Sequence, residues 1–526
     1  MSLTSRDLAT LAAVGISRAE AERQLALLAS PPPPARLLRP CRVGDGILRL
    51  DAAAAEPLLA AAAEAAAAGR LAKFVPASGA ASRMFADLLA FLIDPTAERP
   101  QSAAASVAAR LDELALRPLL ASALTETGKG LDQVLADGDL ATLVSTLVSR
   151  PGLGLAARPK GLLPFHLYPE GPRTAFVEHL VEGAAYLADR QGRCRLHFTV
   201  SPGSDEAFSA ELAEAARTLG ARLGITFEVD LSHQEPATDT LALDRDGQPF
   251  RDADGALLRR PGGHGALLGN LARTRGELVV VKNIDNVLPE RAQAEVIHWQ
   301  RLLVGLAALL TARRDELFHR LGDDAASDAA RREAVALLAE LGHPDAAVSD
   351  RDLPDAAALR ARLDRPLRLC GVVANTGEPG GGPFWVAASD GSASRQLVES
   401  AQVDLADAEQ SALWRSATHF NPVQLVCALD DPAGRRYDLD RFVDPAAVFL
   451  ARKSEGGREL VALERPGLWN GAMAHWHTVF VEVPVATFAP VKTLLDLARP
   501  EHRVLPVPSV GPVASPGGRG YDRSDS

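Results

Sequence analysis

The sequence predicts an α/β protein with a mixed, mainly parallel β-sheet that carries helices on both faces. Three observations support this expectation. Short apolar runs of strand length recur along the chain, helical patterns separate most of them, and polar or glycine-rich stretches follow several runs directly. Strands that alternate with helices imply a largely parallel sheet between two helical layers.

Length and charge limit the organisation and the partners. The chain has 526 residues, beyond the roughly 250–300 at which a single hydrophobic core usually stops growing. We therefore expect one large catalytic core with helical additions, or two domains. The net charge is −11 and no long basic stripe is present. This argues against nucleic-acid binding, which depends on clustered cations, and leaves room for a small anionic substrate.

The four cysteines, at positions 41, 194, 370 and 427, form no CxxC pair. They suggest neither a zinc ribbon nor a disulfide framework. The N-terminus lacks the apolar core of a signal peptide. The longest apolar stretch, residues 302–312, is too short for a membrane span. We expect a cytoplasmic protein with no membrane partner, and the sequence leaves the oligomeric state unknown.

The elements follow in order along the chain. Residues 1–70 are expected to be mainly helical, since their alanine-rich part, 52–68, favours a helix. Strands are predicted at residues 71–76, 195–200, 226–231, 277–281, 368–374, 423–429 and 479–485, and helices at 174–190 and 204–223. Residues 71–290 and 367–505 then form two parts of one core.

Two further segments have a distinct composition. Residues 291–366 are strongly helical and charged, which we interpret as a helical insertion; a set of solvated helix faces explains the same pattern. Residues 506–526 are rich in proline, glycine and serine, and we expect a disordered tail.

The first stretch that carries chemistry is KFVPASGAASRMF, residues 73–85. A buried strand runs into small residues, and Ser82 and Arg83 begin a helix. Small residues let the backbone approach a polyphosphate, and a helix N-terminus supplies N–H donors. An ordinary tight turn between strand and helix explains the stretch equally well.

Two lysines stand in unusual surroundings. Lys160 lies between proline and glycine in the apolar loop RPKGLLP, although a lone lysine is usually surface charge. Lys492 lies in TFAPVKTLLDL and begins a helix, where the macrodipole disfavours a cation. That position argues for a role facing a ligand.

A glycine-rich loop, RRPGGHGALLGN, surrounds His264 with Gly262, Gly263 and Gly265. Such a loop can approach a planar ligand closely. A flexible hairpin tip with an incidental histidine is the alternative.

The most informative stretch is ELVVVKNIDNVL, residues 277–288, where a buried strand turns polar and reaches Asp285. In open α/β sheets, ligands bind outside the carboxyl ends of the strands. A carboxylate there suits Mg²⁺, which prefers one or two carboxylates plus substrate phosphates. The alternative is that Asp285 caps the helix that follows.

Taken in order, these five stretches resemble the UDP-sugar pyrophosphorylase superfamily, which includes the UDP-glucose and UDP-N-acetylglucosamine pyrophosphorylases. ASGAASRM resembles its nucleotide loop, PKGLLP its lysine segment, PGGHG its nucleoside loop, KNIDNVL its metal motif and FAPVKTLLDL its second lysine segment. Over the whole length, THFNPVQLVCAL and GLWNGAMAHWHTVFVEVP are similar to a bacterial branch, the domain-of-unknown-function family 4301.

The resemblance implies a GT-A-like, Rossmann-like core and the reaction of a nucleoside triphosphate with a sugar 1-phosphate to give a nucleotide sugar and pyrophosphate. It favours UTP, with Mg²⁺ or Mn²⁺ as cofactor. Asp285 would bind the metal, and the catalytic cations would be Arg83, Lys160 and Lys492. The nucleotide would meet Ser78, Gly79, Ser82, Arg83, Gln234, Gly263, His264 and Gly265. A phosphorylated acceptor would meet residues of the later half of the chain, namely Asn375, Glu378, His419, Asn421, Asn470 and His475, together with Trp476.

The sequence departs from the family pattern in two places. Ala80 and Ala81 replace positions that often carry glycine or threonine, and the motifs offer no second metal carboxylate. Two other functions remain open. A GT-A glycosyltransferase that uses a finished nucleotide sugar would share the core, and a catalytically inactive nucleotide-binding regulator would share the binding loops.

Overall fold

The computed structural model describes residues 3–79, 81–322, 327–343, 353–377, 381–388 and 391–503. Ala80, Glu378 and the tail 506–526 lie outside the described residues, so the expectations for them stay predictions. Among the described helices, none combines the length and the apolar character that crossing a bilayer requires. All four cysteines are buried and free.

The centre of the molecule is a mixed sheet, which has nine strands within the described residues, in the order β2-β3-β17-β11-β14-β10-β4-β7-β8. Neighbouring strands are parallel except where β14 pairs with β11 and β10. The bounds are Arg42–Val43, Gly46–Leu48, His477–Glu482, Leu367–Ala374, His419–Ala428, Leu278–Lys282, Leu71–Pro76, Arg193–Thr199 and Thr226–Ser232. The predicted mainly parallel α/β fold is therefore confirmed, and all seven predicted strands are present.

The two faces of the sheet bury different sets of side chains. In β10, Leu278 and Val280 join one apolar cluster and Val279 and Val281 join another, because successive residues of a strand point to opposite faces. The first cluster includes side chains of α3 (Ala52–Ala67), α9 (Ala175–Leu187) and α13 (Ala294–Arg320). The second is covered by α12 (Leu268–Ala272) and by short 3-10 turns at Leu439–Phe442 and Gly471–Met473. Helices cover both faces, but the second layer is thinner.

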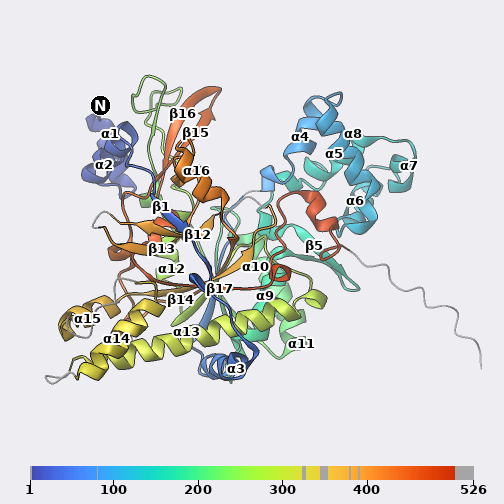
Figure 1. Ribbon diagram of the computed structural model, residues 1–526. Helices are drawn as coiled ribbons and strands as arrows, with labels where there is room; N and C mark the ends of the chain where they lie inside the picture. Colours follow the sequence, from blue (N-terminus) through green and yellow to red (C-terminus); the bar gives the residue numbers. More distant parts are fainter. Residues whose placement is uncertain are drawn as a thin grey trace, which may run out of the picture.

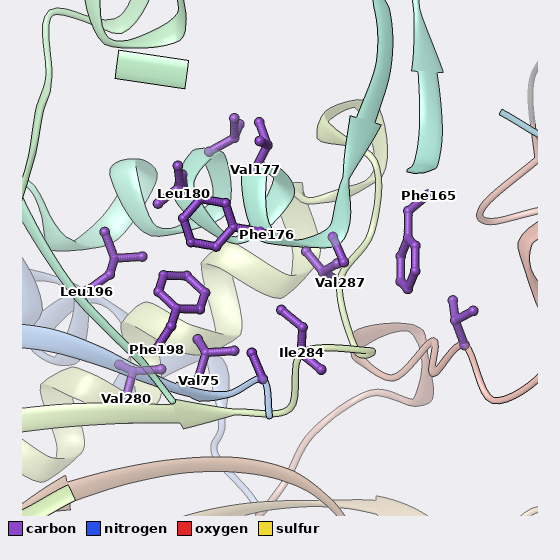
Figure 2. Packing of buried hydrophobic residues seen from close by; sticks show 14 of the residues in the cluster. Val75, Phe165, Phe176, Val177, Leu180, Leu196, Phe198, Val280, Ile284 and Val287 are labelled. Atoms are coloured by element: carbon purple, nitrogen blue, oxygen red, sulfur yellow. The ribbon is translucent and has the colours of Figure 1, made fainter. Parts of the chain in front are cut away.

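Helix α9 is anchored to the sheet by aromatic packing (Figure 2). Phe176 of α9 lies 4.6 Å from Phe198 of β7, measured between ring centroids. Ile284 and Val287, which follow β10, belong to the same cluster. The turn after β10 is thus fixed to α9 by burial of apolar surface.

The N-terminal part is helical and also contains strands. Helices α1 (Ser5–Ala13) and α2 (Arg18–Ala29) pack on a small sheet of β15 (Phe449–Glu455), β16 (Arg458–Glu464) and β9 (Ala242–Leu243). The Gln24 side chain accepts from the Leu241 amide at 3.0 Å, which ties α2 to that sheet. Strands β2 and β3, which the helical expectation for residues 1–70 missed, extend one edge of the central sheet.

Another small sheet combines β1 (Leu37–Pro40), β12 (Gly382–Ala387) and β13 (Ala393–Val398), and α16 (Ala408–Arg415) packs against β1. Strands β5 (Pro164–Tyr168) and β6 (Gly171–Thr174) form a hairpin before α9. The predicted helix 204–223 consists of α10 (Asp205–Ala215), a wider turn at Ala216–Gly220 and α11 (Ala221–Leu223).

A group of helices lies beside the sheet, on the opposite side of the molecule from α1 and α2 (Figure 1). Its members are α4 (Ala86–Ile93), α5 (Glu98–Ala109), α6 (Arg117–Glu126), α7 (Leu131–Ala136) and α8 (Leu140–Val148). Of this group, only a helix beginning near Ser82 and Arg83, in the place of α4, is expected from the sequence.

Residues 291–366 differ from the expected insertion. Helix α13 packs against β10, β11 and β14 and against α3, so it belongs to the main core (Figure 1). A Cβ at Gly305 would lie 1.9 Å from the Leu58 carbonyl oxygen, so glycine permits the close crossing of α13 and α3. The charged pattern concealed this buried stripe. Helices α14 (Asp328–Glu340) and α15 (Ala356–Leu363) pack at the far end of α13.

A buried ion cluster joins α9 to the two central strands. Glu182 of α9 accepts from Lys73 of β4 at 2.9 Å and from Lys282 of β10 at 2.6 Å, and all three side chains are essentially inaccessible to solvent. Burial opposes ionisation of Glu182, but the two ammonium groups outweigh it and lower the pKa of its carboxyl. Burial in turn lowers the pKa of Lys73 to about 8. Removing the carboxylate would leave two cations facing each other without compensation.

We expect Glu182→Ala to lower the free energy of unfolding by about 3–5 kcal/mol, because it leaves the buried ammonium groups of Lys73 and Lys282 without a counter-ion. Urea denaturation of the purified chain measures this. The matched control is Glu22→Ala, which removes a carboxylate from the exposed Arg18–Glu22 pair and should cost less than about 1 kcal/mol. Equal effects of the two substitutions would show that the cluster does not stabilise the core.

Candidate active site

Asp285 lies between two lysines that come from distant parts of the chain. Its Oδ2 accepts from Lys160 Nζ at 2.8 Å and from Lys492 Nζ at 2.9 Å. The Asp285 side chain is 11% exposed and Lys160 14%, whereas Lys492 is 61% exposed. The structure therefore brings three predicted site residues together at the carboxyl end of β10.

Asp285 is not a helix cap. The next α-helix, α13, begins at Ala294, and its capping position is Gln293. The aspartate instead occupies the turn after β10, where its carbonyl oxygen accepts from the Val491 amide at 2.9 Å. This removes the alternative interpretation of the KNIDNVL motif, because the carboxylate pairs with two lysines and caps no helix.

Local packing places Lys160 next to Asp285. The Lys160 amide donates to the Gly79 carbonyl at 3.2 Å, and the Ala81 amide donates to the Arg158 carbonyl at 3.2 Å. A Cβ at Gly161 would touch the Phe208 ring at 3.1 Å and the Ile284 side chain at 3.4 Å. The lysine segment is thus pressed between the predicted phosphate loop and the turn that carries Asp285.

The electrostatics of the three groups are coupled. Burial opposes ionisation of Asp285, but Lys160 and Lys492 outweigh it and lower the pKa of the carboxyl. Burial lowers the pKa of Lys160, Asp285 opposes this shift, and nearby Lys492 and Arg83 add to it. The site concentrates positive charge around one carboxylate, which suits an anionic ligand.

The predicted phosphate loop follows β4 as expected, but its helical part is different. Ser82 and Arg83 are exposed within a 3-10 turn, Ala81–Arg83, and α4 begins only at Ala86. Ser78 is half-buried and its carbonyl accepts from Ser201 Oγ at 2.7 Å, while Gly79 is exposed. The loop offers backbone and Arg83 to solvent next to Lys160, without the helix N-terminus that the sequence suggested.

The glycine-rich loop is rigid, and it is not a hairpin tip. Gly263 has a positive φ of 75°, and a Cβ at Gly265 would lie 2.0 Å from the Pro466 carbonyl oxygen. The His264 ring stacks on Trp469 with centroids 4.1 Å apart and 15° between planes. Its Nδ1 accepts from the Leu468 amide at 2.9 Å, and burial lowers its pKa to about 4. His264 is therefore neutral at physiological pH and carries its hydrogen on Nε2.

A cavity of about 350 Å³ lies beside Lys492. Trp469, which stacks on His264, lines one part, and Lys492 and Asn283 line another. Its other polar side chains are Glu399, Ser400, Asn421 and Asn470. The cavity is therefore bounded by one residue that stacks on His264, Trp469, and by one that pairs with Asp285, Lys492.

Two features mark this cavity as shaped for a ligand. Val423, which lines it, has a φ of 56°, a conformation that β-branched residues rarely adopt. Such strain persists only where surrounding structure imposes it, and it is common at ligand sites. Asn421 Oδ1 accepts from the Val423 amide at 3.0 Å and supports the turn. The Asn470 Oδ1 atom is buried, and no residue of the described part of the chain forms a hydrogen bond with it.

Glu399 is a site residue that the sequence analysis missed. It follows β13 and lines the cavity beside Trp469. Burial raises the pKa of its carboxyl, and the hydrogen bond from Trp469 partly opposes that rise. A polar residue directly after a strand was the available signal, but β13 contains only one short apolar pair and was not recognised.

Several predicted acceptor residues lie away from the cavity. His419 is buried between Thr418 and Glu482, and Asn375 is exposed and accepts from the Gly377 amide at 3.0 Å. His475 is exposed, and Trp476 is buried in the core of the second sheet face. None of these four lines the cavity, because successive residues of a strand or turn face different directions.

Gln234, predicted for the nucleotide, lies in the loop after β8 and is half-buried. The adjoining His233 carbonyl accepts from Asn270 of α12 at 2.8 Å. This places the Gln234 loop beside the helix that follows the glycine-rich loop.

The described side chains of the site offer few ligands for a metal ion. Within the described residues, no group of three or more histidine, cysteine, aspartate or glutamate side chains is placed to hold a metal ion. Asp285 offers one hard oxygen donor, so any Mg²⁺ or Mn²⁺ here would depend on substrate phosphates for its other ligands.

The family model described as "Domain of unknown function (DUF4301)" matches residues 4–503. The chain belongs to the DUF4301 family. Among functionally curated proteins, none matches it.

Solved structures of UDP-sugar pyrophosphorylases share part of its arrangement. The uridine diphosphate N-acetylglucosamine pyrophosphorylase of Trypanosoma brucei is 14% identical, with a TM-score of 0.48. The UDP-glucose pyrophosphorylase of Leishmania major is 15% identical, with a TM-score of 0.43. In both comparisons 94% of this DUF4301 chain and 79% of the other chain are covered.

We expect Gly265→Ala to displace the glycine-rich loop, because the new Cβ would overlap the Pro466 carbonyl oxygen. Overpacking of this kind costs about 1–3 kcal/mol, and it should also disturb the stacking of His264 on Trp469. Thermal unfolding and tryptophan fluorescence measure both effects. Gly269→Ala in α12 is the control, since its Cβ meets only Arg273 Nη1, at 3.9 Å. Wild-type behaviour of both variants would contradict the tight loop geometry.

Proposed function

We propose that this DUF4301 protein is a nucleotidyltransferase that transfers a nucleoside monophosphate from a triphosphate, with UTP favoured, to a sugar 1-phosphate and releases pyrophosphate. One observation carries the proposal. A carboxylate flanked by two lysines, at the carboxyl end of a central strand, adjoins a cavity that ends on a stacked His264–Trp469 pair.

The charges suit two anionic substrates. The reaction requires a phosphate monoester to approach a triphosphate, and cations at the meeting point offset their repulsion. Lys160 lies against the predicted phosphate loop, and Lys492 lines the acceptor cavity. We assign Lys160 to the triphosphate and Lys492 to the phosphate of the acceptor, with Arg83 at the outer edge. The attacking phosphate is already ionised, so the reaction needs no general base.

The glycine-rich loop suits the nucleoside. Gly263 is half-buried with a positive φ, so part of its backbone faces outward, and neutral His264 presents an Nε2–H donor. A base can then meet backbone groups and a planar ring without a charge that would bind phosphate in the wrong place. This arrangement supports a nucleoside position and does not by itself select uracil.

The cavity suits a polyhydroxy acceptor. The Glu399 carboxyl can accept hydrogen bonds, and Asn421 contributes an amide. Hydroxyl groups are the donors that such oxygens pair with, and Trp469 offers an apolar surface for a sugar ring. Lys492 stands at the same cavity, where the phosphate of the acceptor would lie.

Mg²⁺ or Mn²⁺ is part of the proposal, with Asp285 as its protein ligand. Such an ion supplies charge stabilisation at the reacting phosphates. The protein's own contribution is to hold the Asp285 carboxylate ionised, through Lys160 and Lys492.

A glycosyltransferase that uses a finished nucleotide sugar is the second candidate, because the cavity could hold the sugar of such a donor. The pairing of Asp285 with two lysines favours the first function, since a diphosphate donor has less need of both cations.

We expect the wild-type chain to release pyrophosphate from one of the four common nucleoside triphosphates, with Mg²⁺ and a panel of sugar and polyol phosphates. Asp285→Ala should lower kcat by about 100-fold or more, since it removes the metal ligand and the anchor of both lysines. Asp132→Ala, which changes a side chain that is 92% exposed on α7, is the control. Pyrophosphate release that survives in Asp285→Ala would refute the assignment, and release of a nucleoside diphosphate would favour the glycosyltransferase.

We expect Glu399→Gln to raise the KM for the acceptor by about tenfold, because one charged hydrogen-bond acceptor of hydroxyl groups becomes neutral. The KM for the triphosphate should stay within about twofold of wild type. Steady-state kinetics with each substrate varied in turn measure both constants. An unchanged acceptor KM would remove Glu399 from the acceptor site.

A further inference from the structure

A chain of buried polar side chains lies behind Lys492 and takes no part in the proposed reaction. Glu178 Oε1 of α9 is 2.9 Å from His166 Nδ1 of β5, and His166 Nε2 is 3.0 Å from His502 Nδ1. His502 Nε2 is 2.9 Å from the Ala489 carbonyl oxygen. All three side chains are at most 1% exposed, and the two imidazole rings are nearly coplanar in orientation, 6° apart.

The carbonyl at the end of this chain fixes the direction of every hydrogen bond in it. Because a carbonyl oxygen only accepts, His502 Nε2 must carry a hydrogen. Burial lowers the pKa of His502 to about 4 and that of His166 to about 3, so each ring is neutral with one N–H. His502 Nδ1 therefore accepts from His166 Nε2–H, and His166 Nδ1 must accept in turn.

The donor to His166 Nδ1 can only be the carboxyl proton of Glu178. Burial raises the pKa of Glu178 to about 8, so the group is protonated at neutral pH. Tyr168 Oη, which itself accepts from the Glu290 amide at 2.8 Å, also donates to Glu178 Oε1 at 2.7 Å. The chain thus holds one proton at its Glu178 end.

The other end of the chain holds the segment that carries Lys492. The Ala489 amide donates to Asn286 Oδ1 at 3.1 Å, and the Val491 amide donates to the Asp285 carbonyl at 2.9 Å. His502 Nε2 forms a hydrogen bond with the Ala489 carbonyl oxygen of the same segment. Residues 489–492 are therefore fixed by the turn after β10 and by the histidine chain.

We propose that Glu178, His166 and His502 are positioning residues that hold the backbone of residues 489–492, and with it Lys492 against Asp285, only while Glu178 carries its proton. The effect on turnover rests on the proposed function, whereas the effect on the segment does not. When the proton is lost to solvent, the carboxylate requires a donor from His166 Nδ1. Both rings then change tautomer, and His502 Nε2 faces the Ala489 carbonyl with a lone pair.

The charged groups around the chain come from every element packed on it. Those that influence the titration are Tyr168 of β5, Arg173 of β6, Glu182 of α9, Glu290 and Arg291 after β10, and Asp496 and Glu501 near the C-terminal end of the described residues. Arg173 Nη1 lies 4.0 Å from Glu178 Oε2, which favours the carboxylate. Burial outweighs it, so the proton stays on Glu178.

A hydrogen-exchange experiment on the full chain tests the tie to Ala489. In His502→Ala, amide exchange of residues 489–493, followed by mass spectrometry, should accelerate about tenfold, as expected for one lost buried hydrogen bond. His502→Gln should retain wild-type protection, because its amide both donates and accepts. Unchanged exchange in His502→Ala, or equal acceleration in the two variants, overturns the proposal.

The protein contains a second hydrogen-bonded pair of histidines, which serves as a matched control. His343 Nε2 is 3.0 Å from His477 Nδ1, and His477 Nε2 is 3.2 Å from the Leu363 carbonyl oxygen. This second pair stands at the start of β17, at the sheet edge opposite the site. His343→Ala should leave exchange of residues 489–493 at the wild-type rate, and acceleration there would show only general loosening and so overturn the proposal.

The pH response tests the role of the proton. The protection of residues 489–493, corrected for intrinsic exchange, should fall in the wild type as pH rises through about 8, where Glu178 deprotonates. Glu178→Gln presents a permanent N–H donor to His166 and should stay protected over the same range. Identical pH responses of the two proteins overturn the proposal.

Turnover separates this inference from the proposed function. If the protein releases pyrophosphate, His502→Ala should lower kcat by about tenfold with little change in the KM for the triphosphate. The kcat of His502→Gln should equal that of the wild type. An unaltered kcat in His502→Ala overturns the positioning role. If no pyrophosphate is released under any condition, the proposed function fails, while the exchange data still decide whether the tie exists.

Discussion

The buried carboxylate of Glu182, shared by Lys73 and Lys282, is the constraint on which the centre of this fold depends. Its two cations project from β4 and β10, neighbouring parallel strands that bury both faces. Charged side chains are rarely tolerated at such positions unless they are paired. The pairing fixes the position of α9 on the sheet more sharply than apolar packing alone, because a displacement of the helix would leave charges uncompensated.

Helix α9 passes that constraint to the candidate site. His179, one position after Glu178 and three before Glu182, has its Nε2 3.2 Å from the Ile284 carbonyl oxygen, directly before Asp285. Glu178 begins the chain that ends on Ala489. One helix therefore supports both the turn that carries Asp285 and the segment that carries Lys492. Asp285 and Lys492 form an ion pair although they are 207 residues apart in the sequence. Helix α9 fixes the positions of the two segments that carry them.

Local sequence patterns were enough to predict the strands of the central sheet that lie beyond residue 70, and the strand end that precedes Asp285. A run of apolar residues followed at once by polar ones marks a buried strand end, and the GGHG loop is marked by its own composition. Glu399 escaped prediction because β13 has a weak apolar pattern, and Asn375 and His475 were placed in the site although neither lines the cavity. The facing of single residues in turns depends on tertiary packing, which no local period encodes.

The local sequence pattern also fails to reveal the place of some larger elements in the fold. Strands β2 and β3 are two and three residues long, too short for a period to show. Helix α13 carries an exposed charged face, and that face concealed Gln300, Gly305 and Arg314, all of which are buried. The sequence of helix α9, AFVEHLVEGAAYL, places two glutamates and a histidine in an otherwise largely apolar helix. Buried ionisable groups at such spacing indicate a polar network, although their partners lie too far away in sequence to be named.

The charge balance of the site shapes how its ligands would enter. Asp285 Oδ2 is engaged by both lysines, so the carboxylate and the cations satisfy one another before any phosphate arrives. Under the proposed function, triphosphate oxygens would compete for Lys160, and the phosphate of the acceptor would compete for Lys492. Asp285 would then be available to hold a divalent ion, which would supply positive charge at the phosphates. Metal and nucleotide would then each strengthen the binding of the other, since coupling between two sites is reciprocal. A lone carboxylate is a poor metal site by itself, so under the proposed function the ion would be retained only while the substrate phosphates are present.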